Sequence, residues 1–240
     1  MSVIWIGSGR FGSGGDPYWN NVSLLLHGNG ANGSTSIIDS SPNNVTVTAS
    51  NGAAISTSNP KYGTGSIFCN GATQSVSFPD PSLGSNNFTI ETWLNTSSTV
   101  QYAQIIGNEV NTGGTTADGF TLLVNHNTSS DGQIRLYISS GGGATSVANT
   151  ATGDWSDGNW HHIALTRSGN TFTIWTDGTS NGSGTWTGDV NGASTMYVGR
   201  NNVFSPRNLV GYFDDLRITK GVARYTSNFT PPAAQFPDGP

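Results

Sequence analysis

The sequence predicts an all-β protein in which two antiparallel sheets pack as a jelly-roll sandwich. Short strand-like segments recur along most of the chain, and turn sequences such as Asp131-Gly132 separate them. No helical period extends beyond two turns, and only two glutamates occur, so helix-forming residues are scarce. Nothing repeats at equal length, which favours a sandwich over a propeller.

The predicted strands can be placed from their apolar patterns and the turns that bound them. In FTIETWLN, strict alternation places Phe88 and Ile90 on one face of the strand and Glu91 on the other. The strand candidates are residues 23–27, 44–49, 66–70, 75–79, 88–95, 103–108, 119–126, 133–139, 160–167, 171–178, 196–200 and 211–219. About a dozen strands without a linker between them indicate one large β domain.

Composition excludes several classes of function. Charged residues make up 10% of the chain, the net charge is −5 and the pI is about 5.1, which argues against binding of nucleic acid. The single cysteine, Cys69, cannot form an intrachain disulfide and is typical of cytosolic synthesis. The N-terminal residues lack a basic segment and a long apolar run, so we expect no signal peptide and no membrane insertion.

The two ends of the chain are predicted to differ from the domain between them. Residues 1–20 are glycine-rich and read as an anchoring arm, residues 21–230 as the jelly-roll domain, and residues 231–240 as an extended proline-rich tail. The candidate anchoring residues are the aromatic side chains of the arm: Trp5, Phe11, Tyr18 and Trp19. Aromatic burial stabilises interfaces, so the arm docks either on another protein or along its own domain.

The segments FTIETWLN, GNWHHIALTRSGNTFTIWTDG, MYVGR and GYFDDLRITKGVARYTSNFTPP together resemble the laminin-G-like branch of the concanavalin A-like lectin/glucanase superfamily. The resemblance covers roughly residues 22–237 and implies the jelly-roll fold. The ending DDLRITKGVARYTSNFTPP is similar to that of such domains in bacteriophage virion proteins, particularly those of marine and cyanobacterial phages. The superfold hosts lectins, adhesion modules and hydrolases, so the resemblance alone does not settle the function.

The segment GYFDDLR raises a question of register. Tyr212, Asp214 and Leu216 share one face only in an unbulged strand, so we expect either a β-bulge or a cation beside Asp214. Arg217 and Arg224 are expected to hydrogen-bond neighbouring carbonyls or Asp215.

The resemblance implies one Ca²⁺ at the rim of the sandwich, held by Asp39 and by Asp214 or Asp215, with Asn43 adding an amide oxygen. The alternative is that Asp39 caps an Asx turn and Asp215 pairs with Arg217.

A glycan site needs an exposed aromatic platform beside amides and carboxylates. Aromatic residues in loop-like segments are the candidates: Tyr102, Trp155, Trp186 and Phe204. The alternative for each is a place in the core, which takes most aromatics of a large sandwich.

Catalysis is not expected. Glycosidases use two carboxylates about 5–9 Å apart, and the strand around Glu91 carries no second acid. The neighbours His161 and His162 point to opposite faces of a strand and cannot share a ligand site.

These observations predict a non-enzymatic bacteriophage virion protein: a lectin-like domain displayed on the head, tail or fibre. The expected partners are capsid, portal or tail proteins, host-surface glycans and further copies of the chain, a trimer among them. We expect synthesis in the host cytoplasm and release by lysis. A bacterial carbohydrate-binding or adhesion module is the alternative, and a polysaccharide hydrolase the third.

Overall fold

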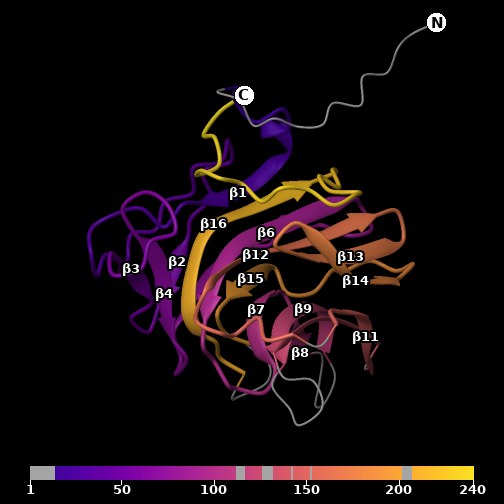
Figure 1. The fold of residues 1–240 in the computed structure, drawn as a ribbon. Helices are drawn as coiled ribbons and strands as arrows, with labels where there is room; N and C mark the ends of the chain where they lie inside the picture. The colour runs from indigo at the N-terminus through magenta and orange to yellow at the C-terminus, as the bar shows by residue number, and fades with distance from the viewer. Residues whose placement is uncertain (1–13, 112–116, 126–131, 142, 152, 202–206) are drawn as a thin grey trace, which may run out of the picture.

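Two antiparallel β-sheets face each other in a sandwich, as the sequence predicts (Figure 1). The structure is a computed structural model that describes residues 14–111, 117–125, 132–141, 143–151, 153–201 and 207–240. A 3-10 turn, η1 (Trp19–Asn21), is the only helical element in these ranges. No helix of the described residues is long and apolar enough to cross a membrane.

The first sheet, called sheet A here, contains the longest described strand, β16 (Val210–Lys220). The order of sheet A is β14 (Thr179–Thr185), β13 (Thr171–Thr176), β12 (Trp160–Ser168), β6 (Phe88–Thr96), β16, β4 (Ser66–Asn70) and β3 (Ala54–Ser56), and β1 (Val22–Leu26) also pairs with β16. The second, sheet B, has the order β11 (Gly143–Asn149), β10 (Gln133–Ser140), β9 (Ala117–Asn125), β7 (Ala103–Gly107), β15 (Thr195–Val198), β5 (Ser75–Pro79) and β2 (Thr48–Ser50), with β8 (Val110–Asn111) pairing with β9.

The core lies between the sheets and follows the two-residue period of the strands. Phe88 and Ile90 of β6 face Leu122 of β9 and Leu136 of β10 within one buried cluster. Residues at the alternate positions, such as Glu91 in β6 and Tyr137 in β10, therefore face outward. This alternation gives each sheet an outer face with its own chemistry.

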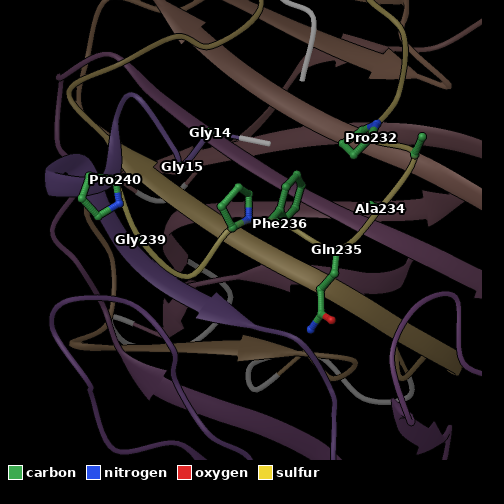
Figure 2. A pocket seen from close by; sticks show the side chains of 10 residues that line it. Gly14, Gly15, Pro232, Ala234, Gln235, Phe236, Gly239 and Pro240 are labelled. Atoms are coloured by element: carbon green, nitrogen blue, oxygen red, sulfur yellow. The ribbon is translucent and has the colours of Figure 1, made fainter. Parts of the chain in front are cut away.

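The chain after β16, residues 221–240, lies across the outer face of sheet A and is called the C-terminal tail from here on (Figures 1 and 2). Tyr225 and Phe229 stack with ring centroids 3.5 Å apart and pack on Trp175 of β13. Further along, Phe236 packs on Val22 and Leu25 of β1. The tail thus gives sheet A a second apolar layer on the side away from the main core.

A buried charge network lies under this tail. Arg217 of β16 donates to Glu91 of β6 at 2.8 Å and 3.0 Å and to Asp16 at 2.8 Å, and Arg224 donates to Asp16 at 2.7 Å and 3.0 Å. Tyr225 donates its phenol proton to Glu91 at 2.6 Å. The expectation that both arginines bond carbonyls or Asp215 is wrong, because these buried cations reach the carboxylates of Glu91 and Asp16 instead.

The two ends of the described chain meet on this same face. The backbone N–H of Asp16 donates to the carbonyl of Gly239 at 2.7 Å. Trp19 packs beside Phe236, whereas the ring of Tyr18 is 42% exposed and lies 5.2 Å from the guanidinium of Arg224. Residues 16–20, which the sequence assigns to the arm, therefore contact the domain, and the anchoring candidates Trp5 and Phe11 lie outside the described residues.

Candidate functional site

A cavity of about 200 Å³ lies on the outer face of sheet B. Thr121 and Leu123 of β9 and Tyr137 of β10 line it, because their core-facing neighbours Leu122 and Leu136 fill the sandwich. Seven of the described residues line the cavity: Tyr102, Glu109, Thr121, Leu123, Tyr137, Ala144 and Arg207. They come from four separate stretches of the chain, which the sheet brings together.

Two tyrosines and an arginine form its wall. The rings of Tyr102 and Tyr137 meet edge to face with centroids 6.3 Å apart. The guanidinium of Arg207 lies 4.9 Å from the centre of the Tyr102 ring. Tyr102 has a φ of +60°, which is uncommon for a bulky side chain and occurs mostly at functional positions and tight turns. The loop before β7 therefore holds this ring in place at a cost in backbone strain.

An amide and carboxyl cluster borders the cavity. The amide group of Asn201 donates to Gln104 at 2.9 Å and to Glu109 at 2.7 Å, and Ser139 donates to Glu109 at 3.3 Å. Burial raises the pKa of Glu109, although these hydrogen bonds and the charge of Arg207 act in the opposite direction. Thr121 also donates to Gln104, at 3.0 Å. Apolar rings beside fixed polar groups are the usual composition of a small-molecule site.

A second, larger hollow of about 530 Å³ lies between the chain ends (Figure 2). Its described lining residues are Gly14, Gly15, Pro232, Ala233, Ala234, Gln235, Phe236, Pro237, Gly239 and Pro240, and none of their side chains carries a charge. Figure 2 shows Gln235 pointing away from Phe236 and the tail. With few polar groups converging on it, this hollow is a poorer candidate than the one on sheet B.

Of the three glycan-binding candidates that the structure describes, only Tyr102 lines the sheet B cavity. Trp155 and Trp186 are partly buried and pack against the main core, which is the alternative that the sequence left open. Trp186 also donates its ring N–H to the carbonyl of Asp189 at 3.0 Å. Phe204 lies outside the described residues.

Sequence reasoning missed Tyr137, Arg207 and Glu109. The position of Tyr137 could have been predicted, because apolar and polar residues alternate in QIRLYIS and place Arg135 and Tyr137 on the strand face opposite Leu136. The sequence gives no sign that Arg207 belongs to the site, since this residue lies outside the predicted strands and reaches Tyr102 only through the fold.

The predicted calcium ligand Asp39 already has hydrogen-bond donors on both carboxylate oxygens. Leu25 and Ser41 donate backbone N–H groups to Oδ1 at 2.9 Å, and Val45 donates to Oδ2 at 2.8 Å. This is the Asx-turn alternative. Asn43 donates its amide to the carbonyl of Val22 at 3.3 Å.

The other two predicted ligands, Asp214 and Asp215, flank a β-bulge. The register of β16 against β6 shifts between Asp214 and Arg217, and Asp215 has a φ of +50°. The bulge that the sequence offered as one solution is therefore present. Asp215 pairs with His27 at 2.5 Å and accepts the backbone N–H of Phe236 at 2.7 Å, rather than pairing with Arg217.

The structure does not gather these aspartates into one metal centre. Within the described ranges, no group of three or more His, Cys, Asp or Glu side chains is placed to hold a metal ion. Asp39 is poorly suited to bind calcium, because backbone N–H groups already donate hydrogen bonds to both of its carboxylate oxygens.

Asp214 leads to a prediction about pH. Burial raises its pKa to about 7, although Tyr62 and Lys61 donate backbone N–H groups to Oδ2. An acid whose folded pKa exceeds its unfolded value stabilises the protein most below the unfolded pKa, and this stability is lost as the pH rises through about 7. His27 acts in the same direction: burial lowers its pKa, but Asp215 and Asp238 outweigh that and raise it.

We therefore expect urea titrations to give a free energy of unfolding that falls by about 1–3 kcal/mol between pH 5 and pH 8. Asp214→Asn removes the titrating group and should flatten this slope. A stability that rises over the same range would contradict the assignment.

No pair of carboxylates suited to glycoside hydrolysis lines the cavity, where Glu109 is the one acid among the described lining residues. Glu91 is a hydrogen-bonded strand residue; burial acts to raise its pKa, but Arg217 and its other partners outweigh this and hold the pKa far below the usual range. His161 bonds Asp157 and Asp177, while His162 lies 3.4 Å from Glu91, so the two histidines have separate surroundings as predicted.

Comparisons with known proteins agree with this architecture. Domain 4 of AbnA, a GH43 extracellular arabinanase from Geobacillus stearothermophilus, was solved in complex with arabinotriose; it is 20% identical, with 84% of this chain and 93% of that chain covered and a TM-score of 0.63. The binding domain of botulinum neurotoxin serotype D is 13% identical, with a TM-score of 0.60 over 85% of this chain and 49% of that one. The receptor binding domain of botulinum neurotoxin type G is 14% identical, with a TM-score of 0.56 over 88% and 49%.

These identities show a shared fold, and this chain spans about half the length of the two toxin domains. No match was found among curated protein sequences. A laminin-G-type sequence profile, described as the concanavalin A-like lectin/glucanases superfamily, matches residues 70–224. Because this match extends over more than half of the sequence, the chain belongs to the concanavalin A-like lectin/glucanases superfamily.

Proposed function

We propose that this chain is a non-enzymatic, lectin-like module on the surface of a bacteriophage particle, and that it binds host-surface glycans at the cavity around Tyr102. The observation that carries the proposal is the pair of Tyr102 and Tyr137 beside the Gln104, Asn201 and Glu109 cluster. Aromatic faces pack against the C–H faces of sugar rings, and amides and carboxyls hydrogen-bond sugar hydroxyls.

A binding role fits the site better than hydrolysis does. The cavity has one carboxyl among its described lining residues, and Asn201 and Ser139 already hydrogen-bond it. Hydrolysis needs a second acid across the scissile bond. The complex of the arabinanase domain with arabinotriose adds support, since that domain has the same fold.

The arrangement of the chain ends suits display on a particle. Asp16 and Gly239 meet on the outer face of sheet A, and the cavity lies on the outer face of sheet B. Attachment through the ends, to capsid, portal or tail proteins, leaves the cavity facing away from the particle. The phage-like ending DDLRITKGVARYTSNFTPP supports the virion setting, in which the protein is made in the host cytoplasm and released by lysis. Assembly as a homo-oligomer is part of this proposal.

A glycan array tests the binding role. The wild-type chain should bind a subset of oligosaccharides, and Tyr102→Ala should weaken that binding at least about tenfold, as expected on losing an aromatic anchor. Tyr212→Ala is the matched control, because Tyr212 packs on Phe68 in sheet A and should keep wild-type affinity. No binding to any glycan, or equal binding by Tyr102→Ala, would contradict the proposal.

The array is run with calcium and with a chelator, which also tests calcium binding by Asp39, Asn43, Asp214 and Asp215. The virion setting is tested by co-purification of the chain with particles, before and after removal of residues 1–13. The cut is placed there because Asp16 must stay to pair with Arg217 and Arg224. A chain that never co-purifies would favour the bacterial adhesion module.

A further inference from the structure

We propose that the cavity around Tyr102 selects an acidic sugar residue, one that carries a carboxylate or a sulfate, and that Arg207 and Arg135 make the selection. The inference rests on the proposed glycan binding and names the class of ligand. Its basis is the placement of two guanidinium groups beside the tyrosine pair on an otherwise acidic chain.

The position of these cations stands out against the charge of the whole chain. The chain has nine Lys and Arg residues but 14 Asp and Glu residues, so its net negative charge repels anions. On sheet A, Arg217 and Arg224 are bound to carboxylates. Arg207 lines the sheet B cavity and lies over the ring of Tyr102.

Arg135 supplies the second cation, from the strand that carries Tyr137. It donates to the Tyr137 hydroxyl at 3.3 Å and to the amide oxygen of Gln133 at 2.8 Å and 3.2 Å. Both of these partners are uncharged, so the bonds fix the guanidinium without neutralising it. The tyrosine pair thus has an arginine on each of its two members.

Glu109, the one acid among the lining residues that the structure describes, offers little repulsion to an anionic ligand. Glu109 is 5% exposed, and Asn201 and Ser139 donate to its two oxygens. Burial raises its pKa, which favours the uncharged form. Among the described residues, the two arginines thus lie beside a cavity whose one lining acid is buried and hydrogen-bonded.

Geometry and size fit a single acidic ring. A guanidinium stacked on an aromatic ring is already ordered, and its planar fork matches two oxygens of a carboxylate or a sulfate. The cavity of about 200 Å³ is smaller than the roughly 300–1,000 Å³ of sites for drug-sized ligands, so it holds one ring of an oligosaccharide.

The test compares matched glycans on one array with the full-length chain. The pairs are oligouronides and their methyl esters, sialylated glycans and their desialylated forms, and sulfated glycans and their desulfated forms. We expect each bound acidic glycan to bind about tenfold or more tightly than its neutral partner, and the preference to shrink at high salt. Uronides and sialylated glycans carry a carboxylate, so comparing their affinity differences with those of the sulfated pairs shows which anion is recognised.

Substitutions of Arg207 test whether this residue makes the cavity prefer acidic glycans. Arg207→Gln should weaken binding of the acidic glycans by about tenfold to hundredfold and of the neutral ones by less than about threefold, because it removes a charge-assisted bond. Arg207→Lys keeps the charge and should keep part of the preference. Lys61→Gln removes one charge at Trp93 on sheet A and is the matched control.

If Arg207→Gln has a lowered melting temperature, Arg135→Gln is measured for the same change in preference. Equal affinity for acidic and neutral partners would overturn the acidic selection and leave glycan binding intact. Absence of binding to every glycan would instead overturn the proposed function. Acidic preference that survives both Arg207→Gln and Arg135→Gln would show that other groups make the selection.

Discussion

Replacing Glu91 by Ala is expected to lower the free energy of unfolding by about 3–5 kcal/mol, because it takes away one of the two carboxylates that bind the buried guanidinium of Arg217. Glu91 is 1% exposed, accepts two bonds from Arg217 and one from Tyr225, and lies against His162. Arg217 would keep Asp16 as its one carboxylate partner at hydrogen-bond distance. Urea unfolding at pH 7 measures the loss.

The matched control is the double variant Glu91→Leu with Arg217→Met, which removes both charges and keeps side chains of similar size. Replacing a buried ion pair by apolar residues is often close to neutral, so the double variant should be more stable than Glu91→Ala. A loss below about 1 kcal/mol for Glu91→Ala would contradict the account of a desolvated network that holds sheet A to its tail.

Phe236→Ala is expected to cost about 3–5 kcal/mol and to release the tail from sheet A. Its ring packs on Val22 and Leu25 and lies 3.6 Å from the guanidinium of Arg217. Removing it opens a cavity over a buried charge and exposes that charge to water. We expect faster tryptic cleavage after Arg224, together with a lower midpoint in urea.

Gln235→Ala is the neighbouring control, because the Gln235 side chain points away from the tail (Figure 2). That change should stay within about 0.5 kcal/mol of wild type. If Phe236→Ala kept both the stability and the protease resistance of wild type, the tail would not be the second layer of sheet A.

Most of the fold can be predicted from the sequence, because alternation of apolar and polar residues encodes strands directly. Residues 66–70 and 75–79 were predicted with the bounds of β4 and β5. The prediction missed β3, β8, β11 and β14. The sequence of β14, TSNGSGT, has no large apolar residue to give a period. It forms because it pairs with β13, and Gly184 brings it against the backbone of Val147, where a Cβ would clash.

The candidate site was predicted only in part, for a physical reason. Tyr102 could be found as an aromatic residue in a loop, but Tyr137 joins it through strand pairing across sheet B, and Arg207 joins it through a loop whose backbone carbonyl accepts the N–H of Gln104. Likewise, Asp16 reaches Arg217 and Arg224 only because the chain ends cross the same face. Sequence spacing carries no signal for such contacts, and only the topology brings the residues together.

Binding of a glycan on the outer face of sheet B is the central claim, and an amide chemical-shift map tests it most directly. The chain is titrated with the oligosaccharide that binds best on the array, and shifts are followed by NMR. The account predicts that the largest shifts lie at Tyr102, at Tyr137 and around Glu109. Shifts confined to the tail or to the rim near Asp39, with sheet B unchanged, would contradict it.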